Sequence, residues 1–114
     1  TKRIPTIGPK YYTEVVAGMR GAVIGGTCRR ANIEGIEVCG KTGTAQNPHG
    51  RDHSAFMGFA PMNNPKIAVA VYVENGGFGA EYGVPIGSLM IEKYLKGEVK
   101  RTEMENQMMN SRIK

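Results

Sequence analysis

The turn-linked pair of apolar segments 53–60 and 67–74 constrains the fold more than any other part of the sequence. Segment 67–74 (IAVAVYVE) is rich in Val, which favours strands, and the connection 61–66 (PMNNPK) is built largely from the turn formers Pro and Asn. A connection this short joins antiparallel neighbours, because parallel strands need a crossover of a dozen or more residues. Segment 67–74 is apolar on both faces, which predicts a central strand covered on both sides.

Two helices and a further strand are expected around this pair. Apolar residues at helical spacing predict a helix near 10–24, and alternation around Gly-Lys-Thr-Gly-Thr predicts a strand near 35–45. A second helix is predicted near 82–96, and the polar segment 98–114 is expected to fray or to form a weak helix. The order predicts an α+β fold with an antiparallel three-stranded sheet flanked by helices.

The composition excludes several classes of protein. Gly supplies 16 of the 114 residues, against a usual share of roughly 7 %, so the backbone needs unusual angles or close approaches. The net charge of +5 arises from scattered basic residues without a run of five, which argues against a nucleic-acid partner. The longest apolar run, 67–73, is too short to cross a bilayer.

Cys28 and Cys39 do not fix the redox compartment, because two cysteines are too few for a disulfide framework. They could pair if the protein matures in an oxidising compartment. Two buried thiols that act as small hydrophobic side chains are the favoured interpretation, and the pairing stays open.

Gly35-x4-Gly40-Lys41-Thr42 satisfies the pattern of a phosphate-binding loop. That motif needs a strand before it and a helix after it. Here the residues between the two glycines alternate like a strand, and Gly43 and Pro48 would interrupt any helix that followed. A nucleotide-binding domain is therefore a remote alternative.

His49 and His53, with Asp52 between them, are the candidate metal ligands. A structural zinc site needs four ligands, and no third ligand with a suitable spacing is present, so we expect no metal and no other cofactor. His53 is instead expected to form a hydrogen bond at the start of its strand.

Lys41-Thr42-Gly43-Thr44 is the most informative motif. Side chains alternate on a strand, so Thr42 and Thr44 share one face, where two hydroxyls can bind a carboxylate beside the positive field of Lys41. Gly43 lets a ligand backbone lie close to the strand. If the strand is a sheet edge, its free N–H and C=O groups can pair with an extended peptide, and one N–H can serve an oxyanion.

The surroundings of this motif make it specific. The chain resembles the C-terminal part of the transpeptidase domain of class B penicillin-binding proteins, and most closely the cell-elongation type, penicillin-binding protein 2. The resemblance runs from about residue 5 to about residue 97. It rests on segments in the family's order and spacing: 11–19 (YYTEVVAGM), 40–46 (GKTGTAQ), 53–61 (HSAFMGFAP), 64–71 (NPKIAVAV) and 74–79 (ENGGFG).

The resemblance implies a serine-type D,D-transpeptidase that cross-links peptidoglycan stem peptides through an acyl-enzyme and is acylated by penicillins. Lys41 would hold the proton network and attract the substrate carboxylate, and Thr42 and Thr44 would bind that carboxylate. The Thr44 N–H would be an oxyanion donor, Gly43 would keep the strand approachable, and Gln46 would line the far end of the groove. The implied partners are stem peptides and β-lactam antibiotics.

Two active-site motifs of the family are not found at the expected places in this sequence. No Ser-x-Asn occurs in the chain, and the one Ser-x-x-Lys match, 111–114, is at the end of a charged tail rather than at the start of a buried helix. Residues 1–97 are therefore expected to be the C-terminal segment of the transpeptidase domain, and 98–114 a polar tail. Alone, the chain should be inactive and should need the remainder of the domain.

Further expectations follow from the family. Its last strand, here 67–73, normally pairs with the first strand of the domain, and without that partner the exposed apolar edge would favour self-association. The family also implies the periplasmic side of the inner membrane, with the anchor outside this chain. The alternatives are a β-lactamase or sensor relative and a non-catalytic basic binding module with the same fold.

Overall fold

The computed structural model describes residues 6–112, so part of the leading segment and part of the 111–114 motif lie outside the described residues. The α+β prediction is confirmed, and the sheet has the order β1-β2-β3 with both pairs antiparallel. None of the helices within residues 6–112 has the length and apolar character that crossing a membrane requires. The elements are α1 (Pro9–Gly25), the short 3-10 helix η1 (Arg29–Ala31), β1 (Cys39–Ala45), β2 (His53–Ala60), β3 (Ile67–Val73), α2 (Gly83–Lys96) and α3 (Thr102–Asn110).

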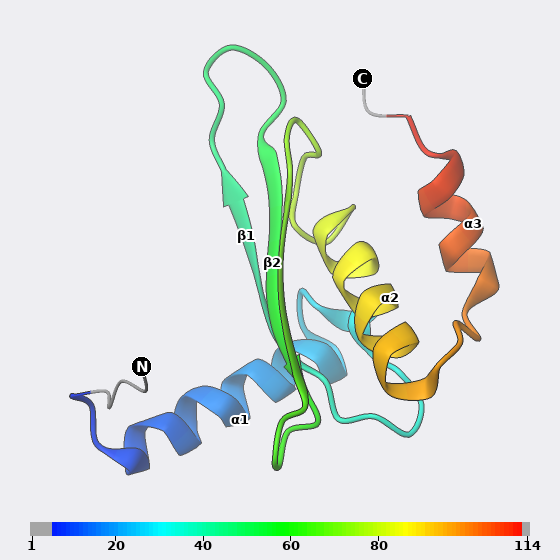
Figure 1. Ribbon diagram of the computed structural model, residues 1–114. Coiled ribbons are helices and arrows are strands. Elements are labelled where there is room, and N and C mark those ends of the chain that lie inside the picture. Colours follow the sequence, from blue (N-terminus) through cyan, green and yellow to red (C-terminus); the bar gives the residue numbers. More distant parts are fainter. Residues whose placement is uncertain (1–5, 113–114) are drawn as a thin grey trace.

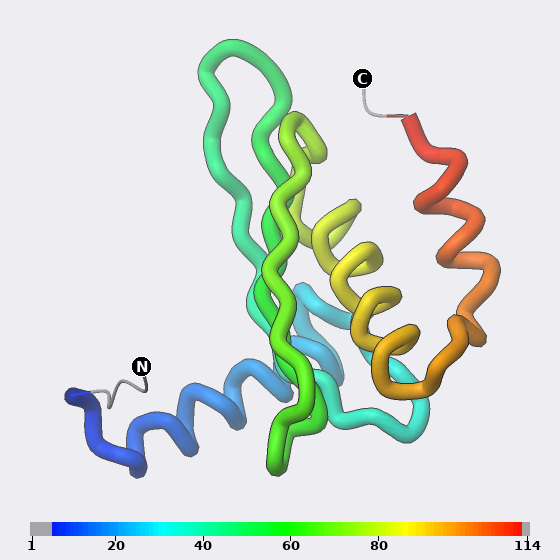
Figure 2. The backbone as a smooth tube through the Cα atoms, in the orientation of Figure 1, coloured from blue at the N-terminus to red at the C-terminus, as the bar shows by residue number. Residues whose placement is uncertain are grey.

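The sheet separates the helices into two groups. Figure 1 shows it nearly edge-on, with α2 against one face, α3 beyond α2, and α1 extending from the base of the sheet on the other side. The trace in Figure 2 shows the β1–β2 hairpin rising well past the start of α2. The hairpin end of β1 therefore extends beyond the helices, whereas the base of the sheet lies among α1, η1 and α2.

Within the described residues, the strand predicted over 67–74 is not central. The central strand is β2, and β3 is an edge strand within the described residues. Its side chains alternate between half-buried and exposed, because Ile67, Val69 and Val71 pack toward α2 and the core. On the opposite face Tyr72 is exposed, and Ala68 and Ala70 line an open hollow together with Met19 of α1.

The predicted strand near 35–45 begins later, at Cys39. A tight turn precedes it, in which Ile33 and Ile36 form an isolated bridge and Gly35 has φ +83. Ile33 and Val38 are buried in the core. Ile36 and Val38 therefore alternate with polar residues because a turn directs them to the core, and not because they belong to a longer strand.

Phe56 of β2 is the largest fully buried side chain, and glycines surround its ring. A Cβ on Gly40 of β1 would stand 2.5 Å from Cε1 of Phe56, and a Cβ on Gly58 would stand 2.6 Å from Cζ. A Cβ on Gly87 of α2 would meet Cδ2 and Cε2 of the same ring. Part of the glycine excess therefore lets two strands and a helix approach one aromatic ring.

Segment 98–114 contains an ordered helix, α3, which a buried charge holds in place. Glu92 of α2 has a side chain that is 1 % exposed, and its carboxylate accepts hydrogen bonds from Arg101 Nε at 2.9 Å and Lys100 N at 3.1 Å. The Arg101 guanidinium also donates to the Arg30 carbonyl at 2.8 Å and to Ser88 Oγ at 3.1 Å. The start of α3 is thereby tied to α2 and η1.

Gly87→Ala is expected to destabilise the protein by about 1–3 kcal/mol, because the added methyl overlaps the Phe56 ring. This cost exceeds the gain in helix propensity of up to about 1 kcal/mol. The matched control is Gly21→Ala in α1, where nothing lies within 4 Å and the propensity gain should appear alone. Denaturant unfolding followed by circular dichroism measures both variants. Equal effects of the two variants would contradict the packing argument.

Arg101→Met is expected to reduce the free energy of unfolding by about 3 kcal/mol, because it leaves the Glu92 carboxylate buried without its cation. The control is Arg51→Met, which removes the Arg51–Glu81 pair, where both side chains are more than 40 % exposed. That change should cost less than about 1 kcal/mol, as exposed ion pairs do. Equal losses in thermal unfolding would show that Glu92 does not depend on Arg101.

Candidate functional site

The Lys-Thr-Gly-Thr motif lies on β1, which is an edge strand of the described sheet. Pairing of this strand with an extended peptide depends on that edge position. Within the described residues β1 pairs only with β2, in a register that places Thr42 opposite Phe56 and Lys41 opposite Met57. Directly opposed residues share a face of the sheet. Thr42 therefore lies on the α2 side with the buried Phe56, and Lys41 lies on the opposite side with the exposed Met57.

Thr42 and Thr44 share one face, as predicted, and each hydroxyl has one partner. Thr42 Oγ1 donates to Thr27 Oγ1 at 3.0 Å. Thr44 Oγ1 accepts the N–H of Gly79 at 3.3 Å. Because an N–H can only donate, this bond leaves the Thr44 hydroxyl proton free for another acceptor.

Gly79 fits against β1 because it has no side chain. A Cβ at this position would stand 2.6 Å from the Ala55 carbonyl oxygen, 2.8 Å from the Gly43 carbonyl oxygen and 3.0 Å from Thr42 Cβ. The loop before α2 therefore rests directly on the β1–β2 ladder. Its position depends on the absence of a Cβ at residue 79.

The Lys41 ammonium lies at the open edge of the strand. Its Nζ donates to the Thr42 carbonyl at 2.7 Å, and the side chain is exposed. The Thr42 carbonyl therefore faces the open side of β1. Thr44 is two residues further along, so its backbone groups face the same side.

Gly43 and Gln46 have less defined surroundings. A Cβ on Gly43 would stand 3.4 Å from Ala55 Cβ, an ordinary contact, so packing within the described residues does not require a glycine there. Gln46 is exposed just after β1 and lines an open hollow of about 480 Å³ together with Asn47, Pro48 and Asp52. The roles expected for both residues remain predictions.

His53 forms the hydrogen bond expected at its strand start. Its Nδ1 accepts the N–H of Asn75 at 2.9 Å, and its ring lies 5.4 Å from the ring of Tyr72. Asn47 Nδ2 donates to Asn75 Oδ1 at 2.9 Å, so the hairpin end is tied to the loop after β3. Residues 6–112 contain no group of three or more His, Cys, Asp or Glu side chains that could hold a metal ion.

Cys28 and Cys39 are both buried free thiols, which confirms the favoured interpretation of the pair. Burial raises the pKa of both thiols above the ordinary value of 9.0. For Cys28, the Thr27 hydroxyl and the charge of Lys41 oppose that increase in pKa, and the thiol lies beside the backbone of Thr42. The segment around Cys28 therefore lies directly beside Thr42 of the motif strand.

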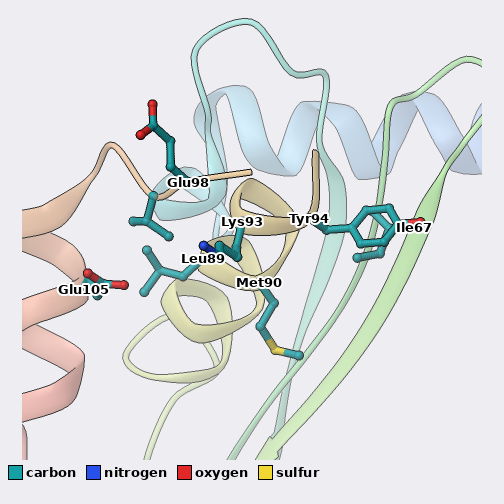
Figure 3. A pocket seen from close by; sticks show the side chains of 8 residues that line it. Ile67, Leu89, Met90, Lys93, Tyr94, Glu98 and Glu105 are labelled. Atoms are coloured by element: carbon teal, nitrogen blue, oxygen red, sulfur yellow. The ribbon is translucent and has the colours of Figure 1, made fainter. Parts of the chain in front are cut away.

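A groove of about 750 Å³ lies away from this strand, between α2, the segment before α3 and the start of β3. Figure 3 shows apolar side chains facing it, including Leu89, Met90 and Tyr94, with Glu98 and Glu105 at its margin. Neither Lys41 nor the threonines of β1 line it. The chemistry-bearing side chains of the motif are therefore separate from this groove.

Residues 2–92 match the family described as the penicillin binding protein transpeptidase domain. The match spans most of the sequence, so the chain belongs to this family, and the resemblance inferred from its motifs is confirmed. The three-stranded antiparallel sheet with its helices is part of the penicillin-binding, β-lactamase-like fold.

Curated relatives and solved structures agree with this assignment. The chain is 41% identical over 81 aligned positions to peptidoglycan D,D-transpeptidase PbpA of Mycobacterium tuberculosis, covering 61% of this chain and 16% of the relative. It is 31% identical over 127 aligned positions to peptidoglycan D,D-transpeptidase MrdA of Haemophilus influenzae, covering 90% of this chain and 20% of the relative. The chain thus spans a fifth or less of the length of these relatives.

Two solved structures show the same arrangement of elements. The imipenem acyl-enzyme complex of penicillin-binding protein A from M. tuberculosis has a TM-score of 0.71 and 34% identity, covering 82% of this chain and 21% of that one. Pseudomonas aeruginosa PBP2 in complex with WCK 5153 has a TM-score of 0.66 and 38% identity, covering 87% of this chain and 23% of that one.

Sequence reasoning missed two residues that contact the motif threonines, Thr27 and Gly79. Both lie in loops that pack on β1 from other parts of the chain, so periodicity and strand alternation give no signal for them. Gly79 belongs to the family-like segment 74–79, and its hydrogen bond with Thr44 links that segment to the motif strand.

Both native thiols are expected to react slowly with a maleimide at neutral pH, because the thiolate is the reactive form and burial raises the pKa of each thiol. The reference is Thr13→Cys, which places a thiol at an exposed position on α1. That thiol should be modified well before Cys28 and Cys39, and all three should react once the protein is unfolded. Modification of Cys28 as fast as the reference thiol would contradict its burial.

Proposed function

We propose that this chain forms the substrate-binding edge strand of a peptidoglycan D,D-transpeptidase that is also acylated by penicillins. The supporting observation is the open edge of β1, which combines an exposed Lys41 with the Thr42 and Thr44 hydroxyls on one face. A cation and two hydroxyl donors beside free backbone groups suit an extended peptide that ends in a carboxylate.

The proposed reaction has two steps. A serine hydroxyl, contributed by sequence outside these 114 residues, attacks the carbonyl carbon between the last two D-alanines of a stem peptide. The C–N bond breaks, the terminal D-alanine leaves with a proton on its nitrogen, and an acyl-enzyme remains. An amine of a neighbouring stem then attacks the acyl carbon, which forms the amide cross-link. The ester C–O bond breaks, and a proton from the amine passes to the serine oxygen.

Each motif residue has a role in this proposal. Thr42 and Thr44 donate hydrogen bonds to the terminal carboxylate, and Lys41 attracts it and holds the proton network near the serine. The N–H of Thr44 faces the open side of β1, where it can stabilise the oxyanion. Gly43 lets the peptide lie against the strand, and Gln46 lines the groove beyond it.

The proposed partners follow from the two edges of the sheet. The β1 edge takes stem peptides or β-lactams, and the β3 edge pairs with the remainder of the transpeptidase domain, or with a second copy of the chain when that remainder is absent. Residues 1–97 would form the C-terminal segment of that domain and 98–114 its tail. The site would face the periplasm from the inner membrane, with the anchor outside this chain.

The protein expressed from its complete reading frame is expected to be labelled covalently by a fluorescent penicillin, whereas the 114-residue chain alone is not. Thr44→Val should reduce the labelling rate at least about tenfold, since it removes a hydroxyl that donates to a charged carboxylate. Thr13→Val, the same change at an exposed position on α1, should leave the rate unchanged. Labelling of the chain alone, or of the Thr44→Val protein at the unaltered rate, would contradict the proposal.

A further inference from the structure

Thr27 is the one residue outside β1 whose side-chain hydroxyl forms a hydrogen bond with a motif threonine in the described structure. It lies in the loop between α1 and η1, and its Oγ1 is 3.0 Å from Thr42 Oγ1. Neither α1 nor η1 contains it, so its position depends on how the chain leaves α1.

The turn that carries Thr27 is held firmly on both sides. The Ala22 carbonyl accepts two backbone hydrogen bonds, one from Gly26 N and one from Cys28 N, both at 3.0 Å. Gly26 fits only without a side chain, because a Cβ there would stand 2.9 Å from Ala22 Cα. Cys28 is fully buried. Thr27 is thus an exposed residue between two fixed neighbours, with its hydroxyl directed at β1.

The chemistry of hydroxyl groups determines which threonine donates this hydrogen bond when a carboxylate binds to Thr42. A threonine hydroxyl donates one hydrogen bond and can accept two, and its proton can rotate between partners. A carboxylate only accepts, so the Thr42 hydroxyl must turn its proton to the ligand, whichever of the two threonines donates when no ligand is bound. Thr27 can then give its own proton to Thr42 Oγ1, so the contact is kept with Thr27 as the donor.

We propose that Thr27 is a positioning residue for carboxylate recognition, which donates to Thr42 Oγ1 when the Thr42 hydroxyl turns to the ligand. This inference rests on the proposed function of β1. Thr44 already has an equivalent donor behind it, the N–H of Gly79 at 3.3 Å. Both carboxylate-binding hydroxyls are then backed by a donor, which strengthens the hydrogen bonds that they give.

The role can be tested with Thr27→Val and Thr27→Ser in the protein expressed from its complete reading frame. The assay is the second-order rate constant for acylation by a penicillin and by the methyl ester of the same penicillin, which lacks the anionic carboxylate. Thr27→Val should slow the penicillin about fivefold, the effect of one net hydrogen bond, and should leave the ester within twofold of the unaltered protein. Thr27→Ser, which keeps the hydroxyl, should react with the penicillin within about twofold of the unaltered rate.

A double variant separates positioning from structural damage. If Thr27 acts through Thr42, then Thr27→Val combined with Thr42→Val should acylate no more slowly than Thr42→Val alone. Additive losses, equal losses with penicillin and ester, or an unaltered rate for Thr27→Val would each overturn the role of Thr27 and leave the proposed function intact. An unaltered protein that neither compound acylates would overturn both.

Discussion

The enclosure of the Phe56 ring by glycines is the constraint on which the rest of the structure depends. Gly40 and Gly58 let the paired backbones of β1 and β2 lie against the ring, and Gly87 lets α2 approach it from the other side. The ring fills the space that three missing side chains leave, so the sheet and α2 come closer than side chains would allow. Gly83, at the start of α2, continues this contact against Ala55 and Phe56.

The site on β1 follows from this close approach. Because α2 begins directly over the β1–β2 ladder, the loop before it places the Gly79 N–H against Thr44. The turn after α1 reaches the same strand from a different direction and brings Thr27 to Thr42. Alternation along β1 places the two threonines on one face, and these two loops give each of them a hydrogen-bonding partner. The geometry of the motif therefore depends on loops that are distant from it in sequence.

The sequence was sufficient for features that depend on local patterns. The short connection 61–66 predicted the antiparallel pairing of β2 and β3, and helical spacing predicted α1 and α2 to within a residue or two. Apolar side chains on both faces of segment 67–74 do not reveal whether another strand lies beside it, so this pattern alone predicts a central strand. The edge position within the described residues follows only from the family resemblance. Contacts such as Thr27–Thr42 and Glu92–Arg101 depend on tertiary packing, for which the sequence has no periodic signal.

The two edges of the sheet differ in a way that fits the proposed function. An unpaired strand edge exposes N–H and C=O groups that attract any other strand, and a lysine on the edge discourages such pairing. β1 carries Lys41 and two threonines, so its edge is less prone to pair with another strand in water. β3 consists only of Ile, Val, Ala and Tyr, and no charge protects it. The β1 edge is therefore suited to transient pairing with a ligand, whereas the uncharged β3 edge is suited to stable pairing with another strand.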